Sequence, residues 1–131
     1  MFLILLSGSL VLAAPPLPPV PGVGQDDFDK VVLKSPRPVV VTFSAGWCVA
    51  CRQLAPTLEE LQSEYQGKVI FAKVTEDDKL QERYKITALP TCIVFVRGQA
   101  YKRIEGNGRK SMYTSFLDRL LEDIVPLPPT D

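Results

Sequence analysis

The chain has 131 residues, of which 46% are hydrophobic and 23% charged, and its formal net charge is zero. This length and composition fit one domain with a hydrophobic core, and without a basic tract nucleic acid is not an expected partner. The sequence contains no histidine, which excludes a Cys–His nucleophile pair, a Ser–His–Asp triad and any histidine-based metal site.

Residues 1–14 form an apolar leader that has no charged side chain. The leader is too short to span a bilayer, which takes roughly 20 residues, but it suits the apolar part of a secretory signal cleaved after Ala13 or slightly later. A signal peptide predicts an extracytoplasmic protein. Because no Lys or Arg lies near Met1, a leader that stays attached and a cytoplasmic location are the alternative.

Two proline-rich segments flank the rest of the chain, residues 15–24 and residues 125–131. Proline-rich segments are extended and stiff, so we expect a linker and a tail. Recognition of the first segment by a polyproline-binding partner is the alternative. The folded domain is therefore predicted over residues 25–124.

Within this domain, short apolar runs alternate with segments of helical periodicity. The apolar runs predict strands that are buried on both faces, and the last helix is expected to turn Met112, Phe116, Leu117, Leu120 and Leu121 inward. The order predicts an α/β fold with a mixed sheet covered on both faces. In chain order, the expected elements are a helix over 26–34, a strand over 39–43, a helix over 48–65, a strand over 69–74, a helix over 78–84, a strand over 91–96, a turn over 97–100, a strand over 101–105 and a helix over 110–124.

A pair of cysteines, Cys48 and Cys51, follows the first strand and opens the next helix, where such sheets form their sites. Residues three apart on a helix face the same way, and the first helical turn can bring them within reach of a disulfide. Free amides and the helix dipole favour a thiolate on Cys48, and the thiolate is the attacking species. Cys51, one turn deeper, is expected to be more buried and less reactive. Thiol–disulfide exchange requires such a pair.

Metal binding and inert packing are the other interpretations of this pair. A structural zinc site takes four Cys or His ligands, and the chain has three cysteines, so we expect no metal. Thiol–disulfide exchange by the two cysteines would need no organic cofactor either. Two inert core thiols remain the alternative, although Trp47 and the helix start argue against it. The third cysteine, Cys92, lies in a predicted buried strand and is expected to be an inert thiol; a regulatory or intermolecular disulfide is its alternative.

Residues 43–52, with Trp47 before the cysteine pair, resemble the thioredoxin family. Pro56 lies where thioredoxins have a helix-kinking proline, residues 86–91 resemble the loop that holds the family's cis-proline, and Gly106 matches the glycine after the last strand. The resemblance implies a three-layer α/β/α fold around a mixed four-stranded sheet. The family's first strand is either missing here or reduced to part of the proline-rich leader. In the second case the sheet would have five strands.

The resemblance also implies roles for the site residues. Cys48 would be the attacking cysteine and Cys51 the resolving one. The substrate-binding surface would be formed by Trp47, Leu89, Pro90 and Gly106. Pro90 would be in the cis form, and the Leu89 backbone would pair with an extended substrate segment. Trp47 would shield the site.

Four residues are expected to tune the site, and here the chain departs from the family. Val49 and Ala50 are neither the Gly-Pro of thioredoxins nor the Gly-His of disulfide isomerases; the WCVAC stretch is similar to the terminal domain of bacterial transmembrane thiol–disulfide reductases. Thr42 replaces a buried Asp that is thought to assist proton transfer, and Lys73 aligns with that acid's partner. Since a threonine hydroxyl is not a base near neutral pH, we expect Cys51 to attack mixed disulfides slowly.

The function implied by the resemblance is a thiol–disulfide oxidoreductase that reduces protein disulfides or relays electrons. Its electrons would come from an upstream reductase or a small thiol, and we expect a monomer with no membrane span. An oxidase or isomerase of the secretory route, using the same residues, is one alternative. The other is a non-enzymatic binding module that uses the groove at Leu89 and Pro90.

Overall fold

The computed structural model describes residue 8 and residues 15–124, so the predicted leader (apart from Gly8) and the predicted tail over 125–131 lie outside the described residues. A mixed four-stranded sheet has the strand order β2-β1-β3-β4. Strand β1 pairs in parallel with β2 and antiparallel with β3, which pairs antiparallel with β4. The strands are β1 (Val39–Ser44), β2 (Ile70–Thr75), β3 (Thr91–Val96) and β4 (Gln99–Glu105).

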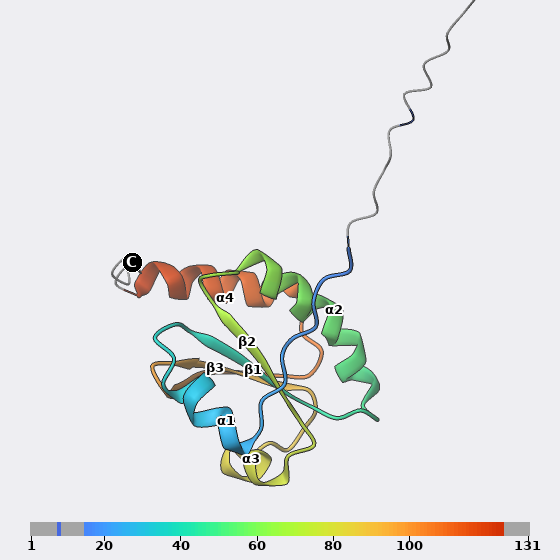
Figure 1. The fold of residues 1–131 in the computed structure, drawn as a ribbon, viewed down its shortest axis with the longest axis vertical. Helices are drawn as coiled ribbons and strands as arrows, with labels where there is room; N and C mark the ends of the chain where they lie inside the picture. The colour runs from blue at the N-terminus through green and yellow to red at the C-terminus, as the bar shows by residue number, and fades with distance from the viewer. Residues whose placement is uncertain (1–7, 9–14, 125–131) are drawn as a thin grey trace, which may run out of the picture.

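Helices cover both faces of this sheet, with α2 and α4 on one face and α1 and α3 on the other (Figure 1). The predicted three-layer α/β/α architecture with four strands is therefore confirmed. No helix in the described part of the chain combines the length and the apolar character needed to cross a membrane. The helices are α1 (Gln25–Phe28), which continues into the π-helix η1 (Asp29–Leu33), then α2 (Val49–Glu64), α3 (Asp78–Arg83) and α4 (Lys110–Asp123).

Strand β1 separates two hydrophobic clusters, and all six of its residues are buried. Alternate side chains of a strand point to opposite faces. Accordingly Val40 belongs to the cluster under α2 and α4, whereas Val39, Val41 and Phe43 belong to the cluster under α1, η1 and α3. The apolar run that predicted a doubly covered strand is thus confirmed.

The inward face of α4 differs from the expected one. Met112 is 50% exposed, whereas its neighbour Tyr113 is only 1% exposed. Two adjacent apolar residues can each begin a helical stripe, and the stripe that continues through Leu117 and Leu120 begins at Tyr113. The Tyr113 hydroxyl donates to Cys92 Sγ at 3.4 Å, so the ring is buried without leaving its polar atom unpaired. The prediction that Met112 points inward is wrong.

The proline-rich segment before α1 supplies one backbone bridge to the sheet. The Lys73 N–H donates to the Pro21 carbonyl and the Val23 N–H donates to the Lys73 carbonyl, both at 2.8 Å. Gly22 and Lys73 form the resulting isolated parallel bridge. A proline has no N–H to donate to a ladder, which explains why the contact does not extend into a regular fifth strand.

Cys92 lies at the centre of the fold and is 0% exposed. Burial raises the pKa of its thiol, against the hydrogen bonds from Thr42 and Tyr113, which lower the pKa. A buried thiol that stays protonated is a poor nucleophile, because the thiolate is the reactive form. The expected burial of Cys92 is confirmed.

The buried Tyr113 and the exposed Met112 predict losses of stability of different size for two neighbouring substitutions. Tyr113→Ala should destabilise the protein by about 3–5 kcal/mol, as for other large buried aromatic side chains. Met112→Ala, at an exposed position, should change stability by less than about 0.5 kcal/mol. Urea unfolding of both variants measures the difference, and a larger loss for Met112→Ala would reverse the assigned face.

The burial of Cys92 predicts how many thiols react in the oxidised protein. With Cys48 and Cys51 joined in a disulfide, Cys92 is the remaining free cysteine. Iodoacetamide should add no label to the folded chain and one label in denaturant, counted by mass. Rapid labelling of the folded protein would contradict the buried position.

Candidate active site

The site begins where β1 ends and α2 starts. Strand β1 ends at Ser44, and the Cys48 N–H donates to the Ala45 carbonyl at 3.2 Å, which closes the intervening turn. Cys48 has an extended backbone and is the N-cap residue of α2. The turn therefore presents the Cys48 sulfur at the position where helices offer unpaired N–H groups.

Cys48 and Cys51 form a disulfide, with their Cα atoms 5.3 Å apart. The Cys51 N–H donates to Cys48 Sγ at 3.2 Å, so the sulfur takes the place of a capping oxygen. On reduction the same N–H would face the Cys48 thiolate, and the helix dipole favours negative charge there. This geometry would stabilise a thiolate on Cys48.

The two cysteines do not differ in exposure as expected. Each is 6% exposed, so the prediction that Cys51 is the more buried of the two is wrong for the oxidised pair. Ala45 packs with both cysteines, and Ala50 and Leu89 pack against this small cluster, which covers both sulfurs to a similar extent. What distinguishes Cys51 is its position on the wall of two cavities.

The loop before β3 lies beside the disulfide. The Leu89–Pro90 peptide bond is cis, as expected, and Leu89 packs against the cysteine cluster. The Thr91 hydroxyl donates to the Ala88 carbonyl at 2.6 Å, and the Gly106 N–H donates to the Pro90 carbonyl at 2.8 Å. The structure thus packs Leu89 against the cysteine pair and joins Gly106 to Pro90, the residue that follows Leu89.

Two exposed apolar side chains flank this covered disulfide. Trp47 is 72% exposed and Val49 is 58% exposed, whereas Ala50 is half-buried. Most of the Trp47 surface therefore contacts solvent rather than the rest of the protein.

Thr42 and Lys73 lie behind Cys51, in one row across the sheet. Thr42 is the cross-strand partner of Lys73 on β2 and of Cys92 on β3. The Thr42 hydroxyl lies 3.3 Å from Cys92 Sγ, and Thr42 is 4% exposed. Its hydroxyl is therefore already engaged with the buried thiol.

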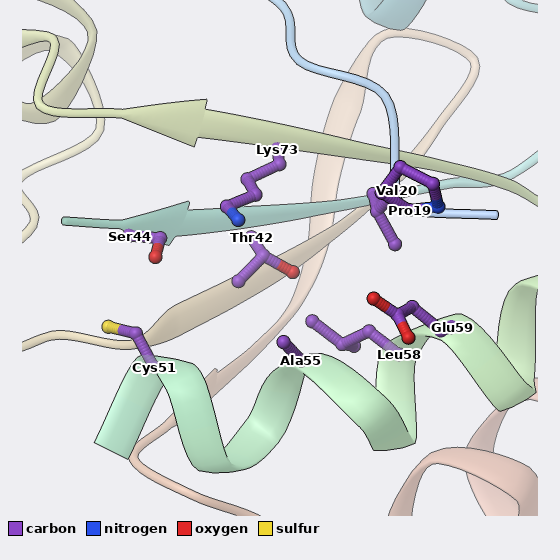
Figure 2. Close-up of a pocket in the computed structure, with 9 residues that line it drawn as sticks. All are labelled: Pro19, Val20, Thr42, Ser44, Cys51, Ala55, Leu58, Glu59 and Lys73. Atoms are coloured by element: carbon purple, nitrogen blue, oxygen red, sulfur yellow. The ribbon is translucent and has the colours of Figure 1, made fainter. Parts of the chain in front are cut away.

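Two cavities connect this row with Cys51. The first cavity, of about 40 Å³, is lined by the side chains shown in Figure 2. The second cavity is about 170 Å³ in volume. Four residues line both: Ser44, Cys51, Ala55 and Lys73. Within the described residues, no group of three or more His, Cys, Asp or Glu side chains could hold a metal ion.

Several cavity residues were not expected from the sequence. Glu59 lines the first cavity and Arg52 the second, and the Arg52 side chain also donates to the Gly46 carbonyl at 2.8 Å. Helical spacing from Cys51 through Ala55 to Glu59 could have identified the acid. No sequence signal places Pro19 and Val20 in the wall of the first cavity.

Comparison with known proteins agrees with this geometry. The thioredoxin family model matches residues 20–119. A thioredoxin of Acidithiobacillus ferridurans is 38% identical over 101 residues, which cover 76% of this chain and 94% of the relative. A thioredoxin of Synechocystis is 35% identical over 103 residues, covering 77% and 96%.

A chloroplastic M-type thioredoxin of Brassica napus is 33% identical over 105 residues, but the match spans only 59% of that relative's length and 79% of this chain. The residues matched by the family model include the cysteine pair at the N-terminus of α2 and the cis-proline loop. On the family model and on these identities, the chain belongs to the thioredoxin family.

Proposed function

We propose that the protein is a thiol–disulfide oxidoreductase that reduces disulfides in other proteins. The observation that carries this proposal is the Cys48–Cys51 pair, with Cys48 at the N-cap of α2 and the Leu89–Pro90 loop packed beside it. Relatives that match almost over their full length are thioredoxins.

In the first step the Cys48 thiolate attacks one sulfur of the substrate disulfide. A bond forms between Cys48 Sγ and that sulfur, the substrate disulfide breaks, and the second substrate sulfur leaves as a thiolate that takes up a proton. The N-cap position and the Cys51 N–H favour the attacking anion. The exposed Trp47 and Val49 would contact the substrate chain around its disulfide.

In the second step Cys51 resolves the mixed disulfide. The Cys51 thiol loses its proton, its sulfur attacks Cys48 Sγ, and the remaining substrate sulfur leaves as a thiolate. The two electrons gained by the substrate are those lost when the Cys48–Cys51 disulfide forms. A dithiol protein or a small thiol must then reduce that disulfide. Thr42 supplies no base for the proton of Cys51, so this step is expected to be slow.

The location and assembly of the protein also belong to this proposal. An extracytoplasmic location rests on the apolar leader over residues 1–14, and a cytoplasmic location is the alternative. The WCVAC sequence supports a reducing rather than an oxidising role. We propose that the protein acts as a monomer on disulfides of protein substrates.

Single cysteine substitutions test the two steps. Cys51→Ser should accumulate a mixed disulfide between Cys48 and a substrate protein, because the resolving thiol is gone. Cys48→Ser, the matched control with the same chemical change, should form no such adduct. Non-reducing gels and mass spectrometry after incubation with a disulfide-containing protein such as insulin measure the adduct. If Cys51→Ser forms no adduct, the chain is a binding module rather than an exchange enzyme.

The reduction potential of the cysteine pair tests the direction of electron flow. A reductase should have a potential near about −270 mV, as thioredoxins do, whereas strong oxidants lie near about −120 mV. Equilibration in thiol buffers of defined potential, followed by alkylation and mass counting, gives the value. A potential close to that of the oxidants would overturn the proposed reducing role.

A further inference from the structure

A short proline-rich segment is attached to the sheet at one residue, Lys73. We call residues 18–23 the N-terminal strap. Two backbone hydrogen bonds of 2.8 Å join the strap to Lys73: the Lys73 N–H donates to the Pro21 carbonyl, and the Val23 N–H donates to the Lys73 carbonyl. The Gln62 side chain of α2 donates to the Pro18 and Pro19 carbonyls at 3.3 and 3.4 Å. Val20 packs against the core under α2 and α4, so the strap joins β2 to α2.

The strap and the Lys73 side chain enclose the same cavity. Pro19 and Val20 line it together with Lys73 and Cys51. In Figure 2 the strap residues lie at one end of the cavity and Cys51 at the other, while the Lys73 side chain extends from β2 into the space between them. The segment that holds the Lys73 backbone therefore also bounds the volume available to its ammonium group.

Charged groups are few around Cys51. Lys73 and Glu59 are the charged residues of the first cavity, and Lys73 and Arg52 are those of the second. Strand β1 contributes the uncharged hydroxyls of Thr42 and Ser44 to the first cavity. Within the described residues Lys73 forms no ion pair within 4.0 Å. A cation beside a thiol favours its thiolate, so the place of this ammonium matters for Cys51.

We propose that the N-terminal strap is a positioning element of the redox site, which holds Lys73 so that its ammonium favours the thiolate of Cys51 during resolution. This inference rests on the proposed function. Val23 and Val20 act through Lys73 and touch neither sulfur that reacts. The strap takes the place of a first strand, but its backbone bonds to β2 are both made by Lys73, whose side chain lines two cavities with Cys51.

The resolving step can be followed separately with an aromatic disulfide, Ellman's reagent. Reduced Cys48 releases one coloured thiolate in a phase that depends on reagent concentration. Cys51 then releases the second in a phase that does not. The pH profile of this second phase reports the thiolate of Cys51. If the wild-type chain shows no second phase, Cys51 does not resolve the mixed disulfide and the proposed function fails, whatever the role of the strap.

Val23→Pro removes the N–H that donates to the Lys73 carbonyl. The second phase should slow about threefold near neutral pH, and its half-maximal rate should move to higher pH by about one unit. A tenfold smaller thiolate fraction is partly offset by the greater nucleophilicity of a more basic thiolate. Leu17→Pro, the control at an exposed position before the strap, should behave as the wild type.

A double variant shows whether the strap acts through Lys73. Lys73→Met should shift the second phase in the same direction, and Val23→Pro should add no further shift in the Lys73→Met background. An equal shift with and without Lys73, or an unchanged profile in Val23→Pro, would overturn the inference. Should Val23→Pro fail to fold, Gln62→Ala removes the two strap contacts on α2; a normal profile in Gln62→Ala would then count against the strap.

Discussion

The burial of β1 between two layers of helices is the constraint on which the rest of the structure depends. All six residues of the strand are buried. A shift of the strand by one residue would move every side chain to the opposite face and would place Thr42 and Ser44 in the other hydrophobic cluster. After Ser44 the chain turns, with the Cys48 N–H bonded to the Ala45 carbonyl. This turn delivers Cys48 to the N-cap of α2 and so places sulfur at the polar end of a helix.

The same register explains why the residues behind Cys51 form one row. Thr42 pairs with Lys73 on one side and with Cys92 on the other, and the Gly22 bridge continues the row beyond Lys73. A threonine at this position satisfies the buried thiol of Cys92 through its hydroxyl, which a charged side chain could do only at the cost of desolvation. The row thus has a neutral centre, with its cation at the edge strand.

The outer edge of β2 shows how composition limits pairing. Prolines in the N-terminal strap prevent a regular ladder, yet Val23 keeps the one N–H that reaches Lys73. Packing of Val20 and the Gln62 contacts hold the rest of the segment against α2. The strap is therefore held by two backbone bonds at Lys73, by the packing of Val20 and by the side chain of Gln62.

The sequence by itself determined the order of elements, the two-sided burial of β1 and the candidate cysteines, because these follow from local periodicity and from the Cys48–Cys51 spacing. The cis-proline loop and Gly106 came from the family resemblance. Tertiary structure decided which of two adjacent residues, Met112 or Tyr113, faces the core, where Cys92 on strand β3 accepts a hydrogen bond from the Tyr113 hydroxyl. It also decided the equal burial of the cysteines and the cavity shared by Lys73, Glu59 and Val20. Both features depend on residues far apart in the chain, Leu89 packed on the cysteine pair and Val20 beside Lys73, and no local pattern encodes such contacts.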